Sequence, residues 1–450
     1  MTARKYFGTD GIRDRAGEGL LTPALVAVYG RALGRFVSAR APGGRVLIGR
    51  DPRISGPSIV ASLAEGLVGD GLVVVDGGVL TTPAVQTLCR EERFDLALVV
   101  SASHNPAHDN GVKVFGGDGR KLPDQDEAAI EALIDGDAGP VLPLEGGRLL
   151  VDADAENRYV AFIRETCLPG LRLGGMTVAL DCAHGAASRI GPKLLDAFGV
   201  RVLVHHAEPD GYNINRDSGV FCIERMRGTV LEQAPAVGLA LDGDADRAMF
   251  LDEDGRVRDG DDIVGALAAD MAERGTLVDR RVVTTVMSNF GLNVFLKRRG
   301  IVQESTNVGD RYVARRMAET GAVLGGEQSG HVILREGSRW YGDGLLTALR
   351  VFEVMRRTGR RLADLCRDIE RFPQILLNVK VRTKPPVAEI EGLAPATKSA
   401  EDALEGEGRV LLRYSGTEPL LRVMVEGRDA ERVNALAESL AAVVRKAVGV

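Results

Sequence analysis

One succession of apolar and polar residues occurs three times in this chain and restricts the folds that it can adopt. An apolar run is followed by apolar residues at helical spacing, then by a glycine and a second apolar run, with copies that begin at Arg45, Thr177 and Val282. Strands that alternate with helices are typical of α/β sheets with parallel strands. The sequence therefore predicts three related α/β units with mixed, mostly parallel sheets.

Each predicted unit then sends a further apolar strand into a polar loop. The loops read "SASHNP" after Leu96 to Val100, "DGDADR" after "VGLAL" and "GGEQSGH" after "AVL". Ligands in such sheets bind beyond the carboxyl ends of the strands. Leu96 to Val100 is apolar throughout, as expected for a strand covered on both faces, so its polar ending indicates a loop delivered to a ligand site.

The pattern changes after Ile369. The runs "ILLNVKVRT", "GRVLLRYSG" and "LLRVMVEGR" read as strands, and Glu431 to Val448 carries apolar residues on one helical face. The Pro-rich segment "RTKPPVAEIEGLAP" is expected to form a loop. These features predict a smaller C-terminal α+β domain, and the predicted domain limits are 1–155, 156–255, 256–368 and 369–450.

Charge and cysteine content exclude several classes of function. The 57 basic and 63 acidic residues of the 450-residue chain are mixed along it and give a net charge of -6, so no basic surface is predicted for nucleic acid or an anionic membrane. Five scattered cysteines without a C-x-x-C pair argue against a disulfide framework and a zinc site.

No apolar run approaches the ~18 residues of a membrane span, and "MTARKYFGTDGIR" has no signal core, so a cytoplasmic protein is expected.

The loop "DGDADR" is a candidate metal site. Asp242, Asp244 and Asp246 occupy every second position, and oxygen ligands suit a hard cation such as Mg²⁺. A solvated acidic turn is the alternative; an EF-hand calcium loop is excluded because Arg247 stands at its glycine position and strands flank the loop. Three like charges directly after a buried strand need a counter-ion, which favours the metal.

The loop "SASHNP" is a candidate for covalent chemistry. It lacks the G-x-S-x-G sequence of a nucleophile elbow, and a plain Asn-Pro turn is the alternative. A serine beside a metal site, with His104 and Lys113 nearby, could carry a phosphoryl group while a neighbouring base takes the hydroxyl proton. The residues alone leave open whether Ser101 or Ser103 would do so.

Two further loops offer partners for anions and hydroxyl groups. "RYSGTEP" joins an arginine, two hydroxyls and a glycine turn, which can hold a phosphate but can also form an ordinary hairpin turn. In "GGEQSGH", Glu327, Ser329 and His331 are suitable partners for sugar hydroxyls. The candidate phosphate ligands are Arg413, Ser415, Gly416, Thr417 and Arg422.

Taken together, these loops closely resemble the motifs of the α-D-phosphohexomutases. The likeness covers nearly the whole chain, through "FGTDGIR", "SASHNP", "PDGYNIN", "DGDADR", "GGEQSGH", "GDG" and "SGTEP" in that order. The resemblance implies a heart-shaped protein in which three α/β domains and a C-terminal lid surround one cleft. It also implies an isomerase that moves a phosphoryl group on a sugar phosphate, through a phosphoserine and a 1,6-bisphosphate, with Mg²⁺ as cofactor.

The resemblance assigns the phosphoryl carrier and the metal ligands. It implies that Ser103 is the phosphoserine and a ligand of Mg²⁺, which Asp242, Asp244 and Asp246 also bind. Arg247 would be a neighbour of the phosphoserine.

The resemblance further implies residues for protons, charge and substrate. His104, Lys113 and Arg13 would handle protons and charge near the serine, without indicating which is the base, while Glu327 and Ser329 would bind ring hydroxyls. A sugar phosphate is the implied partner, and a homodimer is compatible with the family. The non-reacting phosphate would be held by Arg413, Ser415, Gly416, Thr417 and Arg422.

Substrate preference rests on a few positions. Gln328 in "GEQSGH", where enzymes for neutral hexoses resemble "GEMSGH", favours an amino sugar, and neutral hexose phosphates are the alternative. Ala245 replaces the usual glycine of the metal loop, which predicts that this position need not have a positive φ. Tyr414 stands where proline is common, and Trp340 and Tyr341 stand where small hydroxyl residues are usual, near the phosphate and sugar loops.

Overall fold

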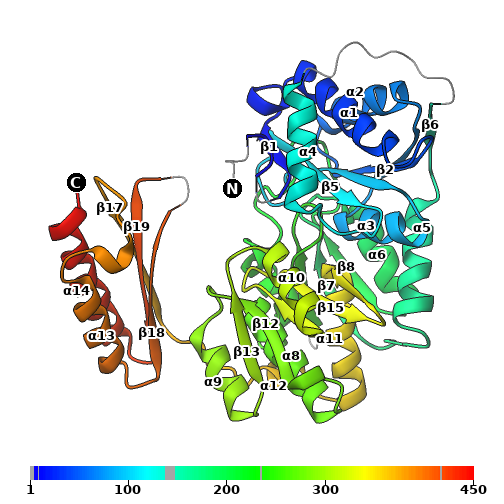
Figure 1. Ribbon diagram of the computed structural model, residues 1–450. Helices are drawn as coiled ribbons and strands as arrows, with labels where there is room; N and C mark the ends of the chain where they lie inside the picture. Colours follow the sequence, from blue (N-terminus) through cyan, green and yellow to red (C-terminus); the bar gives the residue numbers. More distant parts are fainter. Residues whose placement is uncertain (1–4, 9, 137–146, 234–235, 416–417) are drawn as a thin grey trace.

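The chain folds into four units that follow one another in sequence, each built on its own sheet (Figure 1). The computed structural model describes all residues except 1–4, 9, 137–146, 234–235 and 416–417. We call the units I to IV after their sheets, β1–β6, β7–β11, β12–β16 and β17–β19. Units I to III have mixed sheets with a parallel centre, and unit IV is an antiparallel sheet with helices, so the predicted fold class is confirmed.

Unit I contains a six-stranded sheet covered on both faces. Alternate residues of β4 (Leu96–Val100) enter two different hydrophobic clusters, Leu96, Leu98 and Val100 on one face and Ala97 and Val99 on the other. The prediction of a strand buried on both faces is therefore confirmed. Helices α1, α2 and α4 cover one face and α3 the other. The sheet order is β1 (Ile12–Arg15), β5 (Asp109–Gly116), β4, β2 (Arg45–Arg50), β3 (Val73–Val79) and β6 (Arg148–Val151), and the helices are α1 (Pro23–Ser38), α2 (Gly56–Gly69), α3 (Thr82–Glu91) and α4 (Asp124–Asp135).

Units II and III each have a five-stranded sheet in which a parallel centre continues into antiparallel strands. The order in unit II is β11 (Val257–Arg258), β10 (Ala248–Leu251), β9 (Ala236–Leu241), β7 (Thr177–Asp181) and β8 (Arg201–His205), with α5 (Ala155–Phe162), α6 (Ala187–Ala197) and α7 (Arg227–Glu232). The order in unit III is β13 (Val302–Thr306), β12 (Arg281–Thr285), β14 (Leu324–Gly326), β15 (Val332–Glu336) and β16 (Arg339–Gly342), with α8 (Gly260–Glu273), α9 (Phe290–Arg298), α10 (Asp310–Thr320), α11 (Gly344–Thr358) and α12 (Leu362–Leu365).

Units I to III share one hydrophobic core. A single cluster of buried side chains runs from α3 through α5 and α6 to α8 and α11. Polar contacts reinforce it: Asp343 caps α11 by accepting the N-H groups of Leu345 and Leu346, and its other oxygen accepts the Tyr159 hydroxyl at 2.7 Å. Because all these groups are buried, the three units form one body that presents their loops in a fixed arrangement.

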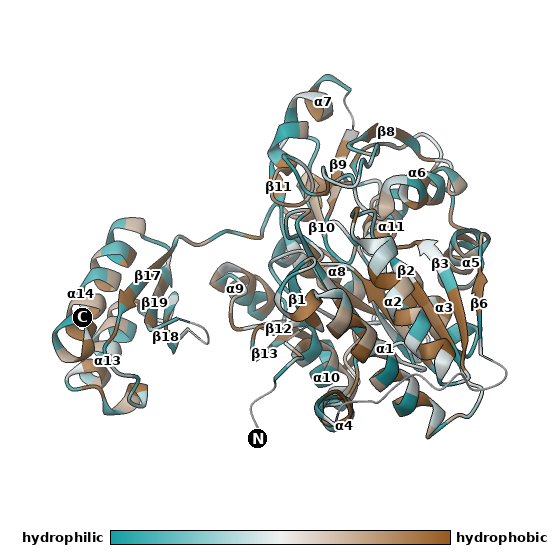
Figure 2. Cartoon of the chain, turned by 90° about the horizontal axis from the view of Figure 1, so that it is seen from above, coloured by the Kyte–Doolittle hydropathy of each residue, from teal (hydrophilic) through white to brown (hydrophobic). Residues whose placement is uncertain are grey.

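Unit IV is set apart from that body in both ribbon views (Figures 1 and 2). Its strands β17 (Gln374–Lys380), β19 (Leu420–Gly427) and β18 (Gly408–Tyr414) pair antiparallel, and α14 (Ala430–Val448) packs on the sheet. The prediction of a loop over the Pro-rich segment was wrong at its end, because α13 (Leu393–Ala403) begins there. Pro395 lies in the first turn of α13, where its missing N-H costs no helical hydrogen bond, and Leu393 and Ala400 are buried in the core of unit IV.

A small set of polar contacts joins unit IV to unit III. Glu426, fully buried on β19, accepts the N-H of Phe290 at 2.9 Å and Nε of Arg409 at 2.8 Å, and Arg409 also donates to the carbonyl of Ser288. Asn289, the N-cap of α9, exchanges two hydrogen bonds with the backbone of Phe372. Unit IV is thus attached at the end of its sheet that lies next to α9. Among the described helices, none is long and apolar enough to cross a membrane.

Candidate active site

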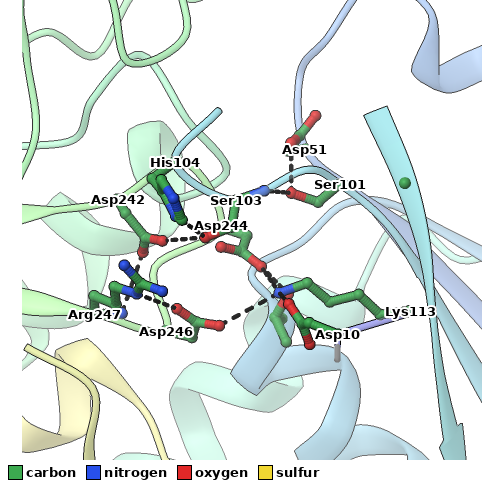
Figure 3. Close-up of polar contacts among 12 residues, drawn as sticks. Asp10, Asp51, Ser101, Ser103, His104, Lys113, Asp242, Asp244, Asp246 and Arg247 are labelled. Atoms are coloured by element: carbon green, nitrogen blue, oxygen red, sulfur yellow. Dashed lines mark hydrogen bonds and ion pairs between the residues drawn. The ribbon is translucent and has the colours of Figure 1, made fainter. Parts of the chain in front are cut away.

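Two of the predicted loops meet at Ser103. The loop after β4 places the Ser103 hydroxyl where it donates to Oδ2 of Asp242 at 2.5 Å, on the loop after β9 (Figure 3). The two loops are in close contact, since a Cβ on Gly243 would lie 2.5 Å from the Ser103 carbonyl oxygen. Ser103 itself has a φ of 52°, a left-handed conformation that non-glycine residues seldom adopt away from functional sites.

Asp242, Asp244 and Asp246 converge as the alternate spacing predicts. One carboxylate oxygen from each lies within 4.8 Å of the other two. Oδ1 of Asp244 and Oδ1 of Asp246 are buried and accept no hydrogen bond from the described residues. Burial, followed by the charges of Asp246 and Asp244, raises the pKa of Asp242 well above its usual value. Orphaned oxygens and mutual repulsion are what a bound cation would relieve, so these residues fit a metal ion.

The expectation for Ala245 was wrong. This residue has a φ of 61°, so the position does require the left-handed conformation that glycine adopts freely. The turn places its N-H on the carbonyl of Asp242 and its own carbonyl on the N-H of Gly344 at the start of α11. The turn that brings the carboxylates of Asp244 and Asp246 together with that of Asp242 therefore holds the alanine in a strained conformation.

Lys113, on β5, contacts two of these aspartates and a further one, Asp10. Its Nζ is 2.6 Å from Oδ2 of Asp244, 3.4 Å from Oδ2 of Asp246 and 3.2 Å from Oδ2 of Asp10 (Figure 3). Burial alone would lower the pKa of Lys113, but the three carboxylates raise it well above its usual value. Sequence reasoning missed Asp10, whose only signal was its place in "FGTDGIR", and Thr82, whose hydroxyl donates to Asp244.

The other residues expected near the serine are also close. Nδ1 of His104 lies 3.4 Å from the Ser103 hydroxyl, and burial, then the charges of Arg247 and Arg13, lower the pKa of His104 to about 4. The N-H of Arg247 donates to Oδ1 of Asp242 at 3.1 Å. Arg13 forms an ion pair with Asp10. The predicted cluster around Ser103 is therefore brought together, with its cations on two sides.

The loop after β14 approaches the aspartates through His331. Its Nδ1 lies 3.7 Å from Oδ1 of Asp246, and although burial opposes it, contact with Asp246 raises the pKa of His331 to about 9. Glu327 accepts the N-H of Gly309, and Ser329 is half-buried beside it. His331, expected among sugar ligands, thus lies beside a carboxylate of the candidate metal site. A cavity of about 720 Å³, a size suited to a small ligand, opens beside Lys113, Asp246 and His331.

The candidate phosphate ligands that the structure describes lie on unit IV, which is set apart from the body of units I to III (Figures 1 and 2). Arg413 and Arg422 are directly opposite each other on β18 and β19, and burial and the charge of Arg422 lower the pKa of Arg413. Nε of Arg422 is buried without a hydrogen-bond partner in the described chain. Lys384, not predicted, donates to the carbonyl of Ser415 at 2.8 Å. Two cations placed side by side in this way are suited to bind an anion. The other two candidates, Gly416 and Thr417, lie outside the described residues.

The unusual aromatic pair on β16 contacts unit I. The guanidinium of Arg120 lies 5.1 Å from the ring centre of Trp340, and that of Arg90 lies 4.4 Å from the ring centre of Tyr341. Tyr414, which stands where proline is common, donates its hydroxyl to the carbonyl of Pro385 within unit IV. These residues therefore make contacts between and within units, and none of these contacts involves the sugar loop.

Comparisons with known proteins agree along the whole chain. Models of the phosphoglucomutase/phosphomannomutase family match in order, alpha/beta/alpha domain I at residues 4–139, domain II at 157–255, domain III at 259–372 and the C-terminal domain at 376–443. The phosphoglucosamine mutase of Rhodospirillum centenum (strain ATCC 51521 / SW) is 44% identical, with 99% of this chain and 96% of that protein covered. That of Deinococcus deserti (strain DSM 17065 / CIP 109153 / LMG 22923 / VCD115) is 45% identical, with 99% of each covered.

Solved structures share the fold. A phosphoglucomutase/phosphomannomutase family protein from Burkholderia thailandensis superposes with a TM-score of 0.79 at 22% identity, covering 99% of this chain and 98% of that one. N-acetylphosphoglucosamine mutase of Aspergillus fumigatus gives 0.62 at 17% identity, covering 99% and 96%. With four domain models in order and relatives matched from end to end, the chain belongs to the phosphoglucomutase/phosphomannomutase family of α-D-phosphohexomutases.

Proposed function

We propose that the protein is a phosphoglucosamine mutase, which interconverts glucosamine 6-phosphate and glucosamine 1-phosphate. The observation that carries the proposal is the hydrogen bond of 2.5 Å between Ser103 and Asp242, which joins a strained serine to a carboxylate cluster. The relatives matched over the full chain at 44% and 45% identity bear the same name. Phosphomannomutase or phosphoglucomutase activity on neutral hexose phosphates is the less supported alternative.

The reaction would consist of two phosphoryl transfers. In the first, O1 of the substrate attacks the phosphorus on Ser103, the P-O bond to Ser103 breaks and a 1,6-bisphosphate forms. After the sugar turns around, the Ser103 oxygen attacks the 6-phosphate, so the phosphoserine is restored and the 1-phosphate is released. The same serine is the donor in one step and the acceptor in the other, which requires one fixed position for its oxygen.

Magnesium is the cation that the donor set favours, because carboxylate oxygens are hard ligands. Asp242, Asp244 and Asp246 would hold it with an oxygen on Ser103. When bound, Mg²⁺ polarises phosphoryl oxygens and offsets their charge. The guanidinium of Arg247, 3.9 Å from Oδ1 of Asp246, and the ammonium of Lys113 add fixed positive charge beside the same carboxylates, so the site can also accept a phosphate that is close to dianionic.

Proton transfer points to His104. Lys113 has a raised pKa and stays charged, so we assign it to charge balance. His104, with a pKa of about 4, is neutral near pH 7 and can accept a proton. Arg13 would hold Asp10 in place beside Lys113.

Substrate binding would divide between units III and IV. Glu327, Ser329 and Gln328 would face the ring, with Gln328 favouring the amino sugar. The distant phosphate would be held by Arg413, Ser415, Gly416, Thr417 and Arg422. Because unit IV stands apart from the body that carries Ser103, productive binding would require that it close over the cleft.

The setting follows from the chemistry and the composition. The proposed partner is a sugar phosphate, with no role for nucleic acid. The enzyme would act in the cytoplasm, in amino-sugar metabolism that supplies cell wall precursors. A homodimer is compatible with this function. The deciding experiment compares kcat/KM for glucosamine 6-phosphate, glucose 1-phosphate and mannose 1-phosphate with Mg²⁺. Preference for the amino sugar supports the proposal, and equal or better turnover of mannose 1-phosphate replaces it with the alternative.

A further inference from the structure

Arg53 is a fully buried arginine that the proposed reaction does not use. It lies in "GRDPRIS", the loop after β2, and β2 and β4 are parallel neighbours, so this loop and the Ser103 loop leave the sheet side by side. Its side chain and that of Asp51 are both 0% exposed. Burying a charged pair is costly unless each hydrogen-bonding group finds a partner, so its contacts indicate what the pair holds.

Every N-H donor of the Arg53 guanidinium has an acceptor. Nε donates to Asp51 Oδ2 at 2.9 Å, and the two terminal nitrogens donate only to backbone carbonyl groups of the Ser103 loop. A lysine has three donors from one nitrogen and cannot reproduce this planar arrangement. The carbonyl acceptors are those of Ser103 (2.9 Å), Asn105 (2.8 Å), Pro106 and Asp109 (3.0 Å).

The same ion pair also reaches the other side of Ser103. Asp51 Oδ2 accepts the Ser101 hydroxyl at 2.6 Å, and the Ser101 oxygen accepts the N-H of Ser103 at 2.9 Å (Figure 3). The N-H of Ser103 is thus held through Asp51 and Ser101, while its carbonyl is held by Arg53. Asn215 of unit II donates to the same carbonyl at 2.8 Å. The strained φ of 52° lies between these two anchored groups.

We infer that Arg53 is a positioning residue, which with Asp51 holds the Ser103 loop in its left-handed conformation so that the serine oxygen keeps one location through both phosphoryl transfers. The inference rests on the proposed role of Ser103 as phosphoryl carrier. Opposite charges on Arg53 and Asp51 cancel, so the pair adds little net field at the phosphate, and its contribution is geometric. A strained backbone persists only where its surroundings over-determine it, and here the four terminal N-H groups of Arg53 and the side-chain amide of Asn215 donate to the loop's carbonyl groups.

The test uses the full-length protein with Arg53→Lys, Arg53→Gln and Arg53→Ala. We expect kcat to fall about a hundredfold, as for a displacement of roughly 1 Å at the reacting atom, with KM little changed. Arg258→Gln is the control, because Arg258, 11% exposed, forms an ion pair with the fully buried Asp252 at 2.8 Å on unit II, and its hydrogen bonds within the described chain go to Asp252 and Asp262 rather than to the Ser103 loop. The control should lose thermal stability comparably but keep kcat within about twofold of the wild type.

Two readouts separate positioning from general loss of structure. Guanidinium ion at non-denaturing concentration should restore kcat at least tenfold in Arg53→Ala, because it can occupy the same acceptors, whereas methylammonium should not. Hydrogen exchange by mass spectrometry should accelerate in residues 101–109 of Arg53→Lys and not in Arg258→Gln. Arg53→Lys carries the test if the alanine variant does not fold.

The outcomes distinguish this inference from the proposed function. If Arg53 variants lose no more kcat than Arg258→Gln at equal stability, or if exchange in residues 101–109 is unchanged, Arg53 has no positioning role. If instead the wild type turns over no sugar phosphate, the proposed function fails, while the exchange comparison still decides whether Arg53 holds the loop.

Discussion

The hydroxyl of Ser103 donates to Oδ2 of Asp242 over 2.5 Å, although the two residues lie 139 positions apart on loops of different units. The shared core of units I to III fixes this contact, so the serine oxygen and the carboxylate cluster form one site. An oxygen held against a carboxylate of a candidate cation site is well placed to carry a phosphoryl group.

We expect purified protein to carry phosphate on Ser103 in at least part of the population. Ser103→Ala should abolish mutase activity, because no other group takes over both transfers. Intact-mass and peptide mass spectrometry locate the phosphate. Phosphate found only at other residues, or full activity in the alanine variant, would rule out this carrier.

Asp244→Asn should lose most activity and need more Mg²⁺ for half-maximal rate. A neutral amide removes one anionic ligand and also weakens the contact with Lys113 at 2.6 Å. Rates measured across a Mg²⁺ titration show the effect. Asp254→Asn is the control, since Asp254 is 47% exposed at the surface and pairs with Arg361. Wild-type activity that persists in excess chelator would contradict the requirement for a divalent cation.

Ala245→Gly should make the protein more stable without loss of activity. Relief of the left-handed strain, about 1–2 kcal/mol, exceeds the entropy cost of glycine, about 0.5–1 kcal/mol. Ala269→Gly, inside α8, should instead cost about 1 kcal/mol. Denaturant unfolding of both variants tests the difference in sign, and destabilisation by Ala245→Gly would show that the alanine conformation is unstrained.

Arg413→Ala should do more than weaken binding. Loss of a charge-assisted contact costs about 1.5–3 kcal/mol, or roughly ten- to a hundredfold in kcat/KM. If phosphate binding also closes unit IV, the bisphosphate should escape, so turnover should depend on added sugar bisphosphate and the phosphoserine should hydrolyse faster. Arg432→Ala, at an exposed ion pair of unit IV, is the control. A variant indifferent to added bisphosphate, with a phosphoserine as durable as that of wild type, would leave Arg413 a passive contact.

Asp261→Asn should change how stability depends on pH. Burial, then the charge of Asp259, raises the pKa of Asp261 from 3.8 to about 8. Between about pH 4 and pH 8 the folded protein keeps this carboxyl protonated while the unfolded chain does not. The free energy of unfolding of the wild type therefore falls as pH rises from about 4 to about 8. The neutral amide removes this penalty and can still accept the N-H of Asn289. Thermal unfolding should favour the variant at pH 8 and differ little at pH 4; an equal difference at both values would refute the assignment.

Local sequence patterns predicted most of the architecture. The triplet at Asp242, Asp244 and Asp246 and the apolar strand Leu96–Val100 carry their signals within a few residues, and both are found as expected. The contacts of Asp10 and Arg53 depend on how distant segments pack, and neither residue stands in a pattern of its own. The expectation for Ala245 was wrong because residue type at one position does not determine its φ, whereas the convergence of the flanking carboxylates imposes the turn.

Unit IV is attached near one end of its sheet, so a rotation about that end would move the opposite end the farthest. Arg409 and Glu426 anchor the end beside α9, and Arg413 lies four residues further along β18. At about 3.4 Å per residue the backbone of Arg413 is about 14 Å from that of Arg409, so a swing of about 10° carries it through about 2 Å and alters the contact of 3.8 Å between its guanidinium and Sδ of Met287 in unit III. The contacts of Glu426 at the attached end thereby limit how far the opposite end of the sheet can move. The stiffness of these buried contacts therefore limits how far the proposed phosphate loop of unit IV can move.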